Sequence, residues 1–106
     1  MRLEMASFRV TRISFGEATA LRDGVLTVDR AAGNIETKRA FKNYQLHLEW
    51  RVPANVEGED QLRGNSGVFL ASTGPRDAGY ELQILDSYNN KTYVNGQAGA
   101  LYKQGI

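Results

Sequence analysis

The feature that most constrains the fold is an alternation of apolar and polar residues with a period of two. It is clearest over residues 44–52 and 80–85, and no segment carries the stripe of an amphipathic helix. Because successive side chains of a strand point to opposite faces, this alternation is typical of half-buried strands. The sequence therefore predicts an all-β chain.

The same pattern places the strands along the chain. Residues 2–15 predict one bent strand or two short ones, because the phase of the alternation changes near Ala6 and Ser7. Asp23 and Gly24 stand between two apolar segments and favour a tight type I′ hairpin. After a connector, further strands are expected at 34–38, 44–52, 67–71 and 80–85, with loops at 53–64 and 86–106. Within the last loop, residues 86–90 suit Asx turns.

Length and composition exclude several classes of protein. A chain of 106 residues supports one domain with one core. The absence of cysteine excludes a disulfide framework, a thiolate metal site and a cysteine nucleophile. A net charge of +1 without a basic run argues against nucleic acid or a membrane surface as a partner. No apolar stretch is long enough for a membrane span and no targeting segment is recognisable, so we expect a soluble chain whose location stays open.

Two strands are expected to carry a core face and a polar face. The predicted core side chains are apolar and alternate with polar ones: Leu46, Leu48, Trp50, Val68, Leu82 and Ile84. The opposite face would present His47, Glu49, Arg51, Glu81 and Gln83. If the two strands are near neighbours, these groups form one surface that suits a hydroxyl-rich ligand.

Simpler interpretations of this surface remain open. Alternating charges are ordinary on the solvent face of an antiparallel sheet. His47 is the only histidine, and a lone histidine on a strand is more often solvated or hydrogen-bonded than a ligand or base. A metal site needs two or three convergent groups, so we expect no metal and no cofactor. Glu49 and Glu81 could form an acid and base pair, although their separation does not follow from the sequence.

Five ordered motifs carry a family resemblance. They are Gly33–Lys38, Tyr44–Arg51, Arg63–Leu70, Tyr80–Tyr88 and Gly96–Tyr102. Residues 33–106 resemble the first part of the 3-keto-disaccharide hydrolase domain family. The resemblance implies a concanavalin-like jelly roll that binds carbohydrate on its concave face.

The resemblance also implies site residues. The catalytic candidates are Glu81 and Glu49, with Glu81 the first choice for the general acid or base. The implied carbohydrate-binding residues come from the same motifs: Arg51, Asn65, Ser66, Gln83 and Asp86.

Residues 1–30 carry a different resemblance. Met1–Glu4, Phe15–Thr19 and Asp23–Val28 are similar to the N-terminus of the component B substrate subunit of glycine, sarcosine and betaine reductases. Two resemblances meeting in one chain imply a recombined protein. We therefore expect a single β domain over residues 1–106, an antiparallel sandwich or partial jelly roll or barrel, with a hairpin segment at 1–32 and a truncated hydrolase-like segment at 33–106.

This organisation sets the expected function. Because only the first part of the hydrolase family is recognisable, we expect no intact catalytic activity and a vestigial carbohydrate-binding face. The alternative is a carbohydrate-active hydrolase acting on 3-keto-glycosides or related sugars. A third possibility is an interaction module that pairs through sheet edges. Strands without neighbours in the chain would also favour self-association, most simply as a symmetric homodimer.

Overall fold

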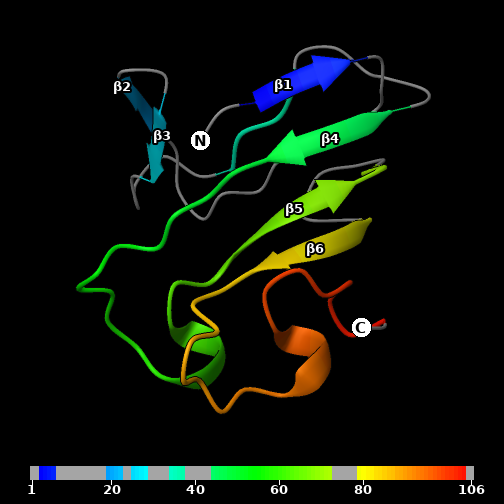
Figure 1. The fold of residues 1–106 in the computed structure, drawn as a ribbon. Coiled ribbons are helices and arrows are strands. Elements are labelled where there is room, and N and C mark those ends of the chain that lie inside the picture. The colour runs from blue at the N-terminus through cyan, green and yellow to red at the C-terminus, as the bar shows by residue number, and fades with distance from the viewer. Residues whose placement is uncertain are drawn as a thin grey trace.

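The computed structural model describes residues 3–6, 19–22, 25–28, 34–37, 44–72 and 79–104. These residues contain three antiparallel two-stranded ladders (Figure 1). They are β1 (Leu3–Ala6) with β4 (Gln45–Leu48), β2 (Thr19–Arg22) with β3 (Val25–Val28), and β5 (Ser66–Leu70) with β6 (Tyr80–Ile84). The helical elements of this part of the chain are two short 3₁₀ turns, η1 (Asp60–Leu62) and η2 (Val94–Gly96). The described part is thus mostly β, as the alternation predicted.

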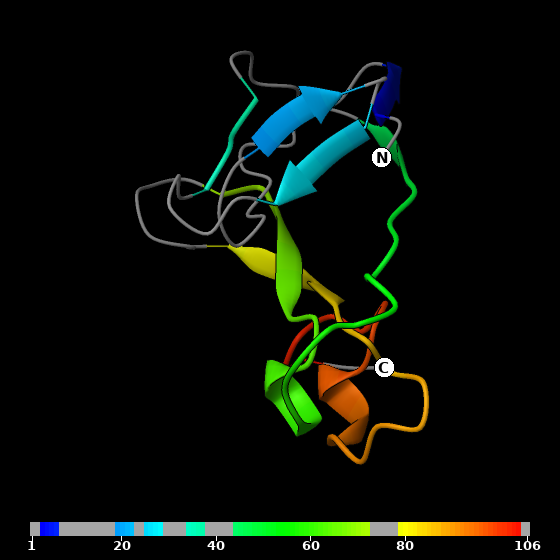
Figure 2. The same cartoon turned by 90° about the vertical axis from the view of Figure 1, so that its left-hand side faces the viewer.

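The predicted N-terminal hairpin is confirmed. β2 and β3 pair antiparallel with Arg22 opposite Val25, and Figure 2 shows the two strands as a pair of their own. The connecting Asp23 and Gly24 lie outside the described residues, and so does Ser7, at which a bend was expected. β1 itself ends at Ala6.

The main apolar cluster lies on one face of the β5–β6 ladder, and Phe69 on the other face is buried as well. Val68 stands opposite Leu82, and Ser66 stands opposite Ile84, so these side chains share a face. Val68 and Ile84 are buried and form its centre. Apolar side chains from β4 and from neighbouring segments pack against them: Ile35, Tyr44, Leu46, Leu48, Leu70 and Leu82. Burial raises the pKa of the Tyr44 phenol, although a hydrogen bond with the Ala71 backbone opposes the rise.

Burial alternates along β4 only as far as Leu48, the last residue of β4 that pairs with β1. Leu46 and Leu48 are half-buried while His47 is exposed, as predicted. β1 provides its last partner at Leu48, and the next three residues, Glu49, Trp50 and Arg51, are exposed. The prediction that Trp50 belongs to the core is therefore wrong: it is 43% exposed, and the ladder between the described residues of β1 and β4 ends two residues before it.

A segment near the C-terminus covers the second edge of β6. Leu101 bridges to Leu82 in antiparallel register, and the backbone N–H of Tyr102 donates to the Glu81 carbonyl at 2.8 Å. The Gln83 N–H donates to the Ala100 carbonyl at 2.9 Å. Gln83 is only 1% exposed, so the prediction that it lies on an open face with His47 is wrong. None of the helical segments in the described ranges is long and apolar enough to cross a membrane.

Candidate functional site

The face of β5 and β6 opposite the core carries the strongest candidate site. Cross-strand register places Phe69 opposite Glu81 and Gly67 opposite Gln83. The Leu82 to Leu101 bridge then sets Tyr102 beside Glu81 on the other edge of β6. We call this surface the Glu81 face: Gly67, Phe69, Glu81, Gln83, Ala100 and Tyr102. Gly67, Phe69, Gln83 and Ala100 are buried, so the half-buried side chains of Glu81 and Tyr102 are its accessible groups.

The Glu81 side chain packs directly over Gly67, in the space that a side chain at residue 67 would fill. A Cβ atom at residue 67 would overlap Glu81 Oε1 and lie 2.8 Å from both Cδ and Cγ. A side chain at this position of β5 would therefore exclude the carboxylate. On its other side Glu81 is next to Phe69, which is 7% exposed. The glycine thus fixes a half-buried carboxylate against the strand.

Gln83 positions Asn65 at the end of this face. The Gln83 Nε2 group donates to Asn65 Oδ1 at 2.7 Å and to the Ile84 carbonyl at 2.9 Å. Asn65 itself is exposed. Of these two predicted carbohydrate-binding residues, Asn65 is therefore open to a ligand while Gln83 orients it from below. Ser66 takes the opposite direction, since its cross-strand partner is the core residue Ile84.

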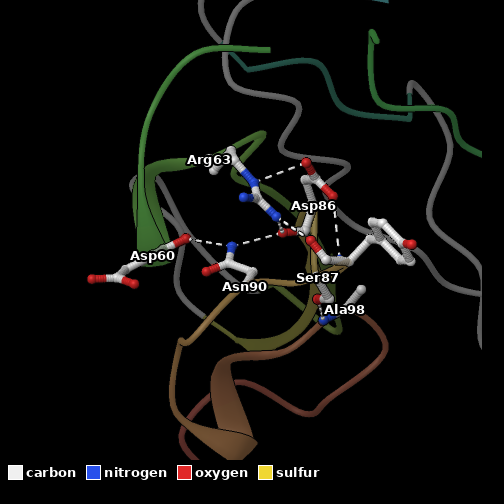
Figure 3. A network of polar contacts seen from close by, with 7 residues as sticks. Asp60, Arg63, Asp86, Ser87, Asn90 and Ala98 are labelled. Atoms are coloured by element: carbon white, nitrogen blue, oxygen red, sulfur yellow. Dashed lines mark hydrogen bonds and ion pairs between the residues drawn. The ribbon is translucent and has the colours of Figure 1, made fainter. Parts of the chain in front are cut away.

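Asp86 belongs to a polar network beyond the end of β6 (Figure 3). Its Oδ2 atom lies 2.9 Å from Arg63 Nε, and both side chains are about three-quarters buried, at 22% and 25% exposure. Arg63 also donates to the carbonyls of Asp86 and Tyr88. The Tyr88 N–H donates to Asp86 Oδ1 at 3.3 Å, which is the Asx turn expected from the sequence. The Asp86 carboxylate is therefore engaged in holding this loop.

Two further side chains tie the loop to its surroundings. Asn90 Nδ2 donates to the carbonyls of Asp60 at 2.8 Å and Asp86 at 2.7 Å, and Ser87 Oγ accepts the Ala98 N–H at 2.8 Å (Figure 3). These hydrogen bonds connect η1 and Ala98 to the loop that follows β6. Arg63, which sequence analysis did not select, is the cation of this network.

Arg63→Gln is expected to lower the free energy of unfolding by about 1–3 kcal/mol, because it removes hydrogen bonds made by a charged group and leaves the largely buried Asp86 carboxylate without its cation. Urea denaturation measures the loss. The matched control is Arg51→Gln, since Arg51 is exposed and its replacement should change stability by about 0.5 kcal/mol or less. Equal losses in the two variants would contradict the structural role of Arg63.

Glu49 and Arg51 are exposed and follow the end of β4. Glu49 Oε1 is 3.1 Å from His47 Nε2, with the two side chains 70% and 66% exposed. The contacts that place Glu81 come instead from Gly67, Phe69 and Tyr102. Within the described ranges no group of three acidic, histidine or cysteine side chains could hold a metal ion.

Sequence reasoning missed a tyrosine pair beside Glu81. The hydroxyl oxygens of Tyr93 and Tyr102 are 2.7 Å apart, and their ring centres are 6.2 Å apart at an angle of 43°. The hydrogen bond between the two hydroxyls is the main cause that raises the pKa of Tyr93 to about 12, and the charge of Glu81 adds to it. Tyr102 was part of a recognised motif, but no local pattern reveals that it returns to the edge of β6.

Comparison with known proteins covers nearly the whole chain with one family. Residues 7–105 match the 3-keto-disaccharide hydrolase family, described as a 3-keto-alpha-glucoside-1,2-lyase-like domain. This is the family that the five motifs indicated, and the match extends it through most of residues 1–30. The comparisons support neither a second family nor a recombined origin. No curated protein and no solved structure matches the chain. The chain therefore belongs to the family of 3-keto-alpha-glucoside-1,2-lyase-like domains.

Proposed function

We propose that the Glu81 face binds a 3-keto-glucoside and that Glu81 is its acid and base group. The observation that carries this proposal is the placement of the Glu81 carboxylate on Gly67, between Phe69 and Tyr102. Sugar sites combine carboxylate and amide groups with aromatic surfaces, and Asn65 adds an exposed amide at the end of the same face. A jelly roll with this face on its concave side is part of the proposal.

The reaction that suits one carboxylate is an elimination. A ketone at C3 of the sugar acidifies the hydrogen on C2, and Glu81 takes that proton. The electron pair of the C2–H bond forms a C1=C2 double bond while the C1–O bond breaks, and the leaving oxygen then gains a proton. Hydrolysis by two opposed carboxylates would need a second acid at a defined distance from Glu81. An elimination requires no second carboxylate.

Binding without turnover is the second candidate, and it corresponds to the vestigial face expected from the sequence. The exposed amide of Asn65 favours it, because an amide can bind a sugar hydroxyl without any proton transfer. The recombined origin is a separate hypothesis that rests on the resemblance of residues 1–30 alone.

One experiment separates these candidates. The unaltered chain is mixed with a 3-keto-glucoside, and in parallel with the parent glucoside, and both binding heat and product formation are followed. Release of the leaving group together with an unsaturated sugar supports the elimination. Binding without product supports the second candidate, and the absence of any binding contradicts both.

Gly67→Ala is expected to weaken binding of the 3-keto-glucoside by about tenfold or more, which corresponds to about 1.4 kcal/mol. The new methyl group would occupy the space of the Glu81 carboxyl, and that flexible group would turn away. Calorimetric titration measures the affinity. The control is Gly99→Ala, which makes the same substitution where the added Cβ would meet no atom within 4 Å. The positive φ of 83° at Gly99 means that this variant also carries some backbone strain. Unchanged affinity in Gly67→Ala would argue against a role for Glu81.

A further inference from the structure

We propose that the Tyr93 and Tyr102 hydroxyl pair is a hydrogen-bond donor site for the keto oxygen of the sugar. The inference rests on the proposed function of the Glu81 face and adds to it the group that recognises the carbonyl. Nothing in the family match assigns a role to either tyrosine.

The backbone brings Tyr102 next to Glu81. The Tyr102 N–H donates to the Glu81 carbonyl at 2.8 Å, one residue beyond the Leu82 to Leu101 bridge. In antiparallel register, residues opposite each other on adjacent strands have their side chains on the same face. The hydroxyl pair therefore lies at the edge of the Glu81 face, and the influence of the Glu81 charge on the Tyr93 pKa agrees with this position.

One of the two tyrosine hydroxyls can donate a hydrogen bond to a ligand. Across the 2.7 Å separation one hydroxyl donates to the other, which leaves the hydrogen of the accepting hydroxyl without an acceptor in the described part of the chain. A hydroxyl that already accepts a hydrogen bond becomes a stronger donor, because the two bonds polarise each other. The contact between the two hydroxyls is exposed, so a ligand can reach this group.

The rings are held before a ligand arrives. Tyr93 rests on Gly96, where a Cβ atom would overlap the ring and lie 2.8 Å from Cδ2. The Gly96 carbonyl accepts from Gln61 Nε2 at 3.0 Å, which joins η2 to η1. Lys103 Nζ lies 5.3 Å from the centre of the Tyr102 ring, so a positive charge is also nearby. A donor fixed in this way loses little conformational freedom on binding.

The chemistry of the two partners matches a ketone. Glu81 as a carboxylate can only accept, and the tyrosine pair supplies the donor that a carbonyl oxygen needs. When the C2 proton leaves, negative charge develops on that oxygen, and a preorganised donor stabilises it. The tyrosines would therefore favour the 3-keto sugar and act further on the charge formed during elimination.

The test compares Tyr93→Phe and Tyr102→Phe with Tyr88→Phe, a control at a tyrosine that is 82% exposed in the loop after β6. Affinity for a 3-keto-glucoside is measured by calorimetry, and the rate of elimination is measured where product forms. We expect the two tyrosine variants to bind about tenfold more weakly. Their rates should fall by a further factor of about 10². The control should bind within a factor of about two of the unaltered chain.

A readout without ligand checks that the hydroxyl pair exists in solution. In a spectrophotometric titration, Tyr102→Phe should bring the pKa of Tyr93 down from about 12 toward the ordinary 10.0, since the hydrogen bond between the two hydroxyls is the main cause of its rise. A Tyr93 pKa that does not move would overturn the pair.

The outcomes also distinguish this inference from the function on which it rests. Weaker binding in Glu81→Gln together with unchanged binding in both tyrosine variants would overturn the tyrosine site and leave the proposed function standing. Lack of binding by the unaltered chain would overturn both.

Discussion

Glu81→Gln is expected to lower the rate of conversion of a 3-keto-glucoside by about 10²- to 10⁴-fold. Glutamine has nearly the shape of glutamate and can keep its place on Gly67, but an amide cannot take a proton from carbon. The fold should be unaffected, because the side chain is half-buried on the face opposite the core. Initial rates of product formation, with circular dichroism as the test of folding, measure the effect.

Glu57→Gln is the matched control for this substitution. It removes the same charge from an exposed loop position, so its rate should stay close to that of the unaltered chain. A rate in Glu81→Gln similar to that of the control would exclude Glu81 as the base. Loss of rate in both variants to the same extent would point to net charge rather than to a base on β6.

Local alternation located β4, β5 and β6, although burial alternates only along β4. The strand predicted at 34–38 is wrong over the described residues 34–37, where the structure has a single bridge residue at Ile35. Residues 44–52 and 80–85 contain β4 and β6, and Val68 and Ile84 are in the core as expected. The pattern also assigned Gln83 correctly to the face opposite Ile84. It failed to predict the burial of Gln83, because the covering segment comes from residues 99–102, which are distant in sequence.

The candidate site shows the same limit. Glu81 could be selected from its motif, and Asn65 with it. The tyrosine pair depends on the return of Tyr102 to the edge of β6 and on the turn at η2 that presents Tyr93. Neither event produces an alternation in the sequence, since the first arises from backbone pairing between distant segments and the second from a single 3₁₀ turn. Arg63 was missed for a related reason: its partners Asp86 and Tyr88 lie more than twenty residues away.

Self-association stays a prediction. It was based on sheet edges without neighbours, and the outer edge of β6 has one in the segment around Leu101. That edge is therefore less open to a second copy than the sequence alone indicated. Light scattering at low micromolar concentration distinguishes a dimer from a monomer of 11.8 kDa.

The largest loss of stability is expected from Ile84→Ala, by about 2–5 kcal/mol in the free energy of unfolding. Ile84 is 5% exposed and packs with Val68 at the centre of the core, so the smaller side chain leaves a cavity that rigid strands cannot close. Trp50→Ala should cost about 1 kcal/mol or less, because a side chain 43% exposed loses less buried surface. Guanidinium denaturation followed by far-ultraviolet circular dichroism measures both variants, since Trp50 is the only tryptophan and fluorescence would be lost with it.

The order of these two losses tests the position of the core. A tryptophan buried in it, as the uninterrupted alternation through residue 52 predicted, would cost about 3–5 kcal/mol on truncation. The structure instead ends β4 at Leu48, where β1 provides its last partner. A larger loss for Trp50→Ala than for Ile84→Ala would mean that the strand continues and that the core extends beyond Leu48. A larger loss for Ile84→Ala supports a core centred on β5 and β6, directly behind the strand that carries Glu81.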